Sequence, residues 1–388
     1  MTTYDWIVIG GGITGAALAY ELVKKNFTVL LLEKDATLQG ATRYSYGGLA
    51  YWSGTSELTR QLCHEGIEIH RHLSEELNAD TEFRELDLLL TIDSEDNPQV
   101  VADRYAHFAI PPTLLSVDDA CELEPLLNQN AIAGALTVRH GHIDAEKTTQ
   151  AYSEAFRRAG GEIQIAQVVE LLRQGNQIEG VKTPKQTYHA SNTVICAGGL
   201  SRALLKAAGI SVRLYFTHAE AIETLPLDLK LHTLVMPAYI KRFDLEAKAS
   251  TAEVDPLWDE PGYEPVPPIL DAGAVQFLDG RLLLGQLSRT LTDSHAQVDP
   301  KASEAAIRAQ VGKVLPALEQ IPGTWHQCLV AFSSNRLGVV GALPNVEGVY
   351  VFSGVTTPLV FVPPLAKRFA NWVTGQDDSV LAQLSPKQ

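Results

Sequence analysis

The chain has 388 residues, enough for roughly two to three domain-sized bodies. Lysine and arginine number 31 against 46 aspartates and glutamates, so the net charge of −15 argues against nucleic acid or an anionic membrane surface as a partner. No apolar stretch reaches the roughly 20 residues that span a bilayer, and no signal peptide is visible. The four cysteines are scattered without C-x-x-C spacing, so we expect no metal site, no disulfide scaffold and a cytoplasmic location.

The N-terminal segment carries the most informative pattern in the chain. A strand over 6–9 runs into a glycine motif, Gly10–Gly15, and a helix over 13–25 follows. A second strand over 28–32 ends at Glu33. This order of strand, glycine turn, helix, strand and acid predicts a dinucleotide-binding unit.

Each glycine of the motif is expected to have a structural role. Gly10 permits the tight turn, Gly12 lets backbone approach a pyrophosphate, and Gly15 lets the helix pack closely on the strand. The helix N-terminus offers free N–H groups to phosphates, and Glu33 can accept hydrogen bonds from ribose hydroxyls. The alternative is a glycine-rich turn kept for packing.

The elements that follow alternate less regularly than repeated βαβ units, which disfavours an NAD-dependent dehydrogenase. Residues 39–52 predict a polar loop with an aromatic end, and 56–77 predicts a helix with one apolar face. The next predicted elements are strands over 88–92 and 131–138 flanking a helical piece at 118–123, a helix over 144–159, strands over 162–172 and 181–183, and a buried strand over 193–197.

Strands and loops dominate residues 212–325, with a hairpin predicted around Asp279-Gly280 and a helix over 302–315. The acidic, proline-bearing segment 244–264 reads as a solvated excursion or as a lid. The remaining predicted elements are a strand over 348–354, an apolar loop over 355–362 and a helix from Pro363 to Thr374. We therefore predict an α/β (α+β) chain whose nucleotide-binding domain is discontinuous, over 1–85, 140–211 and 326–388, with a second domain over 86–139 and 212–325.

Six separated segments resemble the flavin-dependent amine and amino-acid oxidoreductases of the D-amino-acid oxidase, glycine oxidase and sarcosine oxidase superfamily, and occur in that family's order. The resemblance implies a Rossmann-like FAD-binding domain and a second, mainly antiparallel-sheet substrate domain. It also implies oxidation of a C–N bond by hydride transfer to flavin N5. The segments are Gly10–Gly15 with Glu33, Ala41–Leu49, Gly141–Asp144, Val194–Gly199, Asp279–Gly285 and Val340–Gly354.

The resemblance also assigns residues to FAD. A threonine-rich loop after Gly354 would approach the pyrimidine end of the flavin, where backbone N–H donors stabilise charge on reduced flavin, and Pro358 cannot donate. The assigned residues are Gly10, Gly12, Ile13, Thr14, Gly15, Glu33 and Lys34 for the ADP half; Thr42, Arg43, Gly47, Gly48 and Leu49 for the pyrophosphate and flavin; Val168 for the adenine side; Ala197 and Gly198 beside the cofactor; and Gly354, Thr356, Thr357 and Pro358 at the flavin.

The substrate positions depart from the family. Val330 falls where many members place an arginine that holds a substrate carboxylate, and Arg336 is the nearest substitute. Leu283 falls where sarcosine oxidases place a lysine that promotes reaction with oxygen, which favours a dehydrogenase or weak oxidase. The predicted pocket residues are Tyr51, Tyr239, Gln286 and Arg336, with Tyr44, Tyr46, Trp52, His218 and His326 as further candidates; packing between the domains is the alternative role for each.

Cys328 matches the position where sarcosine oxidases attach FAD through a thioether. A small buried core residue is the favoured alternative, so we expect non-covalent FAD. The expected function is oxidation of a small amine or amino-acid-like substrate, with that molecule and an electron acceptor as partners. The alternatives are a flavoprotein acting on C–OH or C=C bonds, and a flavin-binding protein without turnover.

Overall fold

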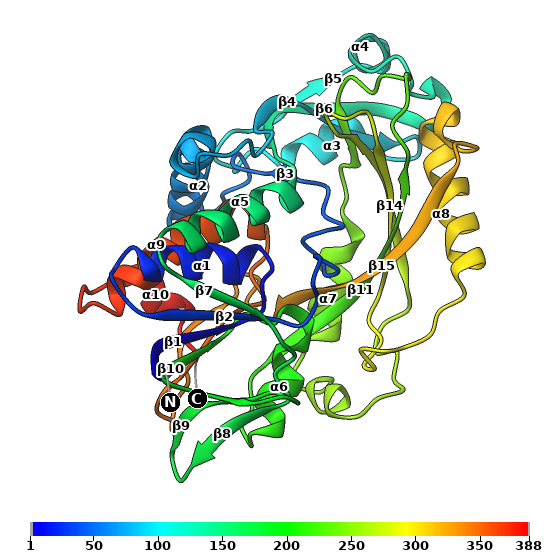
Figure 1. Cartoon of the computed structure of the whole chain (residues 1–388). Coiled ribbons are helices and arrows are strands. Elements are labelled where there is room, and N and C mark those ends of the chain that lie inside the picture. Colours follow the sequence, from blue (N-terminus) through cyan, green and yellow to red (C-terminus); the bar gives the residue numbers. More distant parts are fainter. Residues whose placement is uncertain (1–2, 387–388) are drawn as a thin grey trace.

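Two β-sheets organise the chain in a computed structural model that describes residues 3–386 (Figure 1). The strands of sheet A come from three distant parts of the sequence, and the central ones run parallel. In spatial order they are β16 (Val339–Ala342), β17 (Val349–Ser353), β10 (Thr187–Ile195), β1 (Thr3–Ile9), β2 (Val29–Glu33) and β7 (Glu162–Ile165), with β9 (Gln177–Lys182) on β10 and β8 (Glu170–Gln174) on β9.

Sheet B is mainly antiparallel and is larger, and only its β12–β4 pair is parallel among the described strands. In spatial order it contains β15 (Gly323–Ser333), β11 (Leu214–Thr224), β14 (Leu282–Arg289), β13 (Ile269–Gln276), β12 (Leu234–Pro237), β4 (Arg84–Asp93), β6 (Ile132–His142) and β3 (Gly48–Leu49), with β5 (Thr113–Leu115) on β6. The α/β class and the division into a parallel-rich sheet and an antiparallel sheet are confirmed, whereas the domain boundaries stay a prediction.

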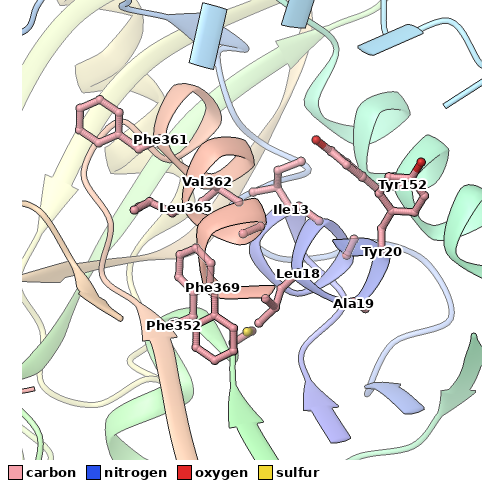
Figure 2. Packing of buried hydrophobic residues seen from close by; sticks show 14 of the residues in the cluster. Ile13, Leu18, Ala19, Tyr20, Tyr152, Phe352, Phe361, Val362, Leu365 and Phe369 are labelled. Carbon is pink, nitrogen blue, oxygen red and sulfur yellow. The ribbon is translucent and has the colours of Figure 1, made fainter. Parts of the chain in front are cut away.

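Helices cover sheet A, and their apolar side chains form its main core (Figure 2). Phe352 of β17 and Phe369 of α9 (Pro358–Trp372) lie nearly parallel, with ring centroids 6.4 Å apart, and Leu18 of α1 (Ile13–Val23) packs beside them. Burying each such side chain contributes about 1.5–3 kcal/mol. The other helices of this region are α2 (Glu57–Glu76), α5 (Ala145–Arg158), α6 (Ser201–Ala207) and α10 (Ser379–Leu384).

Sheet B is covered on its outer face by α8 (Pro300–Val314), whose Ile307 and Val311 pack with Ile222 and Leu284 of the sheet. Smaller helices, α3 (Pro98–Asp103) and α4 (Val117–Leu123), lie near β5 and β6. Among residues 3–386 no helix is long and apolar enough to cross a membrane.

The C-terminal helix differs from its predicted start. It begins at Pro358, after Thr357 in the left-handed region, and continues through Pro363 and Pro364. Proline cannot donate to the carbonyl four residues earlier. The freed carbonyl of Leu359 accepts instead from Nε2 of His70, at 2.7 Å, so α2 compensates the missing hydrogen bond and the helix persists.

The acidic segment 244–264 is mostly exposed, as a solvated excursion would be, but a few of its side chains are buried. It overlaps α7 (Lys241–Ala249), which the sequence patterns missed, and Glu246 and Trp258 are buried in it. The carboxylate of Asp271 in β13 accepts from the backbone N–H groups of Lys241 and Arg242, at 2.9 and 3.1 Å. This contact fixes the start of α7 on sheet B.

Candidate active site

The glycine motif forms a turn that only glycine can make. Gly10 has φ +105°, and a Cβ there would lie 2.5 Å from the carbonyl oxygen of Cys196. A Cβ on Gly15 would lie 1.8 Å from the carbonyl oxygen of Gly10. The backbones of strand β1, its turn and α1 therefore lie in direct contact. The glycines of the turn carry no side chain that would cover the N-terminus of α1.

That helix N-terminus has the properties of a phosphate site. Gly12 is the N-cap and supplies no side-chain hydrogen bond, so the first N–H groups have no intrahelical partner. The N–H of Ile13 donates to Oγ1 of Thr42, at 3.1 Å, which brings the loop 42–49 to the helix end. Thr14 and Gly15 follow in the first turn.

Glu33 ends β2 beside the turn and accepts from the backbone N–H of Gly11, at 2.6 Å, and of Asp35, at 3.0 Å. A cavity of about 180 Å³ adjoins it, lined in part by Gly11, Glu33, Thr149 and Arg157. The ammonium of Lys34 pairs with Asp35 at the surface. The helix end without a side-chain cap, the acid and the adjoining cavity fit the phosphates, ribose and adenine of a dinucleotide.

The remaining residues assigned to FAD lie on three other segments of the chain. Val168 is half-buried in the core beside β2 and β10, and Ala197 and Gly198 follow β10. Gly354 has φ +69°, and a Cβ there would lie 2.7 Å from Leu214 of sheet B. Thr356 and Thr357 lead into α9, whose first residue is Pro358.

We call the turn Gly10–Gly15, the first turn of α1 and Glu33 the dinucleotide cradle. The loop 42–49 connects this cradle to sheet B. Gly48 pairs with His142 of β6, while the Tyr46 hydroxyl lies 3.3 Å from where a Cβ on Gly285 of β14 would stand. Gly47 has φ +70° and Leu49 is fully buried. A cofactor bound at α1 and extended along this loop would reach sheet B.

Arg43 of the loop 42–49 forms ion pairs with helix α5 and with strand β11 of sheet B. Its guanidinium makes two hydrogen bonds to Glu223 of β11, at 3.0 and 2.9 Å, and its Nε lies 3.0 Å from Glu146. Arg281 pairs with the same Glu223, at 2.9 Å, and with Asp144 at the start of α5, at 2.5 Å. We name Arg43, Glu146, Glu223, Arg281 and Asp144 the junction network, because it ties sheet A helices to sheet B strands.

Two buried histidines beneath the loop were missed by the sequence patterns. Burial lowers the pKa of His140 and of His142 to about 3, so both rings are neutral. Nδ1 of His140 accepts from the indole N–H of Trp52, at 3.0 Å, whereas neither nitrogen of His142 has a partner among the described residues. The sequence signal was their alternation in the segment His140-Gly-His142, which places both rings on one face of β6.

The four predicted pocket residues do not form one cluster of contacts. Tyr51 lies beside Arg71, with 6.0 Å between guanidinium and ring centre, and the Gln286 amide donates to Ser288, at 3.0 Å. Tyr239 is 48% exposed and its hydroxyl donates to Asp244. Arg336 is exposed and donates to the carbonyl of Phe243 in α7, at 2.7 Å.

One face of sheet B, which we name the Thr217 face, adjoins the loop 42–49 where Ala221 pairs with Gly285. Thr217, Ala219 and Ala221 alternate along β11 and therefore share one face. Val330 and Cys328 of β15 stand directly opposite Thr217 and Ala219. Burial raises the pKa of the Cys328 thiol to about 12, so the thiolate that a covalent bond requires is scarce at neutral pH.

Three other candidates, Tyr44, His218 and His326, lie at β11 and β15 but do not share one face. Tyr44 stacks on His326, with ring centroids 4.5 Å apart, and His326 lies 3.6 Å from Glu223. His218 points to the opposite face of β11, and one of its ring nitrogens lies 3.0 Å from the carbonyl of Asp293. Burial lowers the pKa of both histidines. Among the described residues no group of histidines, cysteines and acids is placed to hold a metal ion.

Sequence comparison finds relatives that are named as oxidases. A relative from Paenarthrobacter nicotinovorans, 4-methylaminobutanoate oxidase (formaldehyde-forming), is 26% identical over 95% of this chain, and the chain spans 43% of it. Glycine oxidase from Geobacillus kaustophilus is 27% identical over 56% of the chain and 61% of its own length. This chain therefore spans less than two thirds of each of these relatives.

Solved structures share the fold over the full chain. A glycine oxidase crystal structure from Geobacillus kaustophilus superposes with a TM-score of 0.80, at 22% identity, covering 100% of this chain and 99% of that one. L-proline dehydrogenase from P. horikoshii gives 0.79, at 18% identity, over 99% and 97%. The family described as DAO, FAD dependent oxidoreductase, matches residues 5–372. This chain belongs to that family of FAD-dependent oxidoreductases.

Proposed function

We propose that this chain oxidises the C–N bond of a small amine or amino-acid-like molecule, with non-covalently bound FAD as the hydride acceptor. The observation that carries the proposal is the short loop 42–49. It touches the dinucleotide cradle through Thr42, and it touches sheet B beside the Thr217 face through Tyr46. A substrate on that face would therefore stand where a cofactor held by the cradle ends.

The residues that would hold FAD are the first turn of α1, Glu33 and the loop 42–49. When bound, FAD supplies the two-electron acceptor. The protein's part is to orient the substrate and exclude water. No strong base is required, because a neutral amine can lose its α-hydrogen as hydride.

The electron acceptor that we propose follows from the aliphatic side chain of Leu283. Leu283 is buried, with 2% exposed, where sarcosine oxidases carry a lysine. We therefore propose a dehydrogenase or a weak oxidase, working in a reducing compartment such as the cytoplasm, since all four cysteines are free. Reoxidation of the reduced protein by air should be slower than by an artificial acceptor such as a quinone.

The test is the visible spectrum of the purified protein under anaerobic conditions. Flavin bands that bleach with small secondary or primary amines support the proposal. Bleaching by hydroxy acids alone would replace it with oxidation of a C–OH bond. Flavin bands that no amine, amino acid or hydroxy acid bleaches would indicate a flavin-binding protein without turnover.

A further inference from the structure

An arginine and a histidine converge on one carboxylate oxygen in the junction network. Oε2 of Glu223 accepts from the guanidinium of Arg43, at 2.9 Å, and Nε2 of His326 lies 3.6 Å from the same oxygen. The second distance is slightly longer than a hydrogen bond. Because 23% of the His326 side chain is exposed, a proton from water can reach the ring. His326 can therefore change its charge beside the ion pair of Arg43.

The ring of Tyr44 contacts both of these side chains. It stacks on His326 with 4.5 Å between ring centroids, and the guanidinium carbon of Arg43 lies 5.2 Å from its centre. Burial lowers the pKa of His326, Glu223 partly opposes this effect, and the charge of Arg43 lowers the pKa further. Such a coupling is reciprocal. A proton on His326 and an Arg43 bonded to Glu223 therefore disfavour each other.

Arg43 has a second place to bind, in the dinucleotide cradle. Oγ1 of Thr42 accepts from the N–H of Ile13 at the start of α1, at 3.1 Å, and the Cα atom of Arg43 is only about 3.8 Å farther along the chain. The resemblance assigns Arg43 to the pyrophosphate. Its guanidinium instead bonds to Glu223 and lies 3.0 Å from Glu146. The two carboxylates therefore hold the arginine away from a phosphate that its backbone adjoins.

We propose that His326 is a positioning residue for FAD: when it is protonated it replaces Arg43 at Glu223, and Arg43 turns to the diphosphate of FAD. The inference rests on the non-covalent FAD of the proposed function, but not on its substrate. A proton from water binds the imidazole, and Nε2 then donates to Oε2 of Glu223. The released guanidinium can donate two parallel hydrogen bonds to a phosphate. FAD is therefore held more tightly as the pH falls.

The other groups that face His326 keep their charge between pH 8 and pH 6. Cys328, on the same strand, has its pKa raised by burial to about 12, and burial also raises the pKa of Tyr44. The arginines and carboxylates of the junction network carry their ordinary charges in this range. Within this group of side chains, a change between pH 8 and pH 6 therefore reports on His326.

The experiment follows the release of FAD from diluted holoenzyme at pH 8 and pH 6, through the fluorescence that free flavin regains. FAD itself has no group that titrates between these values. One coupled proton limits the change in affinity to about tenfold per pH unit. Release from the parent protein should be roughly three- to tenfold slower at pH 6. Equal rates at the two pH values would overturn the proposal.

Two variants test the two side chains separately. His326→Gln removes the titrating ring, and Arg43→Gln removes the guanidinium, so each should release FAD at both pH values as fast as the parent protein does at pH 8. The matched control is His218→Gln. His218 is also buried and its pKa is also lowered by burial, but it lies on the opposite face of β11. It should keep the parent's pH dependence.

The variants contradict the proposal if the pH dependence persists in His326→Gln or in Arg43→Gln, or if it disappears in His218→Gln. A second probe decides where a variant holds no FAD. Riboflavin lacks the diphosphate, so flavin-free parent protein should bind it equally well at pH 8 and pH 6, whereas its affinity for FAD should rise at pH 6. An equal pH dependence for both flavins would overturn the role of the diphosphate.

This inference and the proposed function fail separately. Amines that bleach the flavin of a protein whose FAD release does not depend on pH would retain the function and overturn the role of His326. A release that depends on pH through His326, in a protein whose flavin no amine bleaches, would retain that role and overturn the function.

Discussion

The dinucleotide cradle and the Thr217 face of sheet B are built from different parts of the chain. The glycine turn of the cradle consists of backbone from one short segment, where Gly10 and Gly15 bring a strand and a helix to contact distance. The Thr217 face and its border consist of side chains from three separate segments, which include Tyr46, Thr217 and Cys328. A site made of local backbone can be read from a motif, whereas a site made of distant side chains requires the folded chain.

The largest effect is expected when a side chain is placed in the glycine turn of the cradle. Gly15→Ala places a Cβ 1.8 Å from the Gly10 carbonyl oxygen, so we expect purified protein without flavin. Gly40→Ala is the matched control, because a Cβ there has no atom within 4 Å. The measurement is the ratio of flavin to protein absorbance. Full flavin content in Gly15→Ala would show that backbone contact does not define the cradle.

Acid should destabilise the packing that supports the cradle. Burial lowers the pKa of His70 to about 4, while the unfolded value is near 6.5, so the unfolded chain binds the extra proton between these values. Stability is therefore lost as the pH falls from about 6.5 toward 4, by about 3 kcal/mol for this residue.

The check is His70→Gln, which removes the titrating group and keeps a donor for the Leu359 carbonyl. Urea unfolding at pH 7 and pH 4 should show a loss of stability about 3 kcal/mol smaller than in the parent protein. An identical pH dependence in both proteins would mean that His70 does not contribute. His140 and His142, with pKa values near 3, add to the same trend in both proteins.

The junction network tests whether the two regions depend on each other. Arg281→Met leaves Asp144 without its cation, and we expect a loss of about 2 kcal/mol in the free energy of unfolding. Glu223 keeps Arg43, which limits the loss. Arg139→Met removes an exposed arginine paired with Asp87 and should change stability by less than about 0.5 kcal/mol. Equal effects in thermal unfolding would contradict a special role for the network.

The smallest effect is expected at Cys328 on the face of sheet B. Because its pKa is raised to about 12, the thiol stays protonated at neutral pH and FAD remains non-covalent. Cys328→Ser should bind the same amount of flavin as the parent protein, and acid precipitation should release the colour from both. Colour that stays with the parent pellet and leaves the Cys328→Ser pellet would establish a covalent bond.

The sequence predicted the strand, glycine turn and helix of the cradle well because their determinants are adjacent. The turn at Gly10, the helix after it and the hairpin at Asp279-Gly280 all follow from short-range rules of backbone conformation. The start of α9 was predicted too late, since the hydrogen bond by which His70 supports Leu359 joins residues far apart in the chain. Helix α7 was missed for the same reason: Asp271 caps it from a later strand.

Sheet A also sets the order in which the protein can be completed during synthesis. The ribosome delivers β1 first, but its neighbour β10 emerges only after sheet B has begun, and β17 emerges near the end. Until then the first helix has no α9 to cover it. Pairings between strands that are distant in sequence form slowly. Nascent chains should therefore acquire flavin late, and they should depend on chaperones until β1 has paired with β10 and β2 with β7.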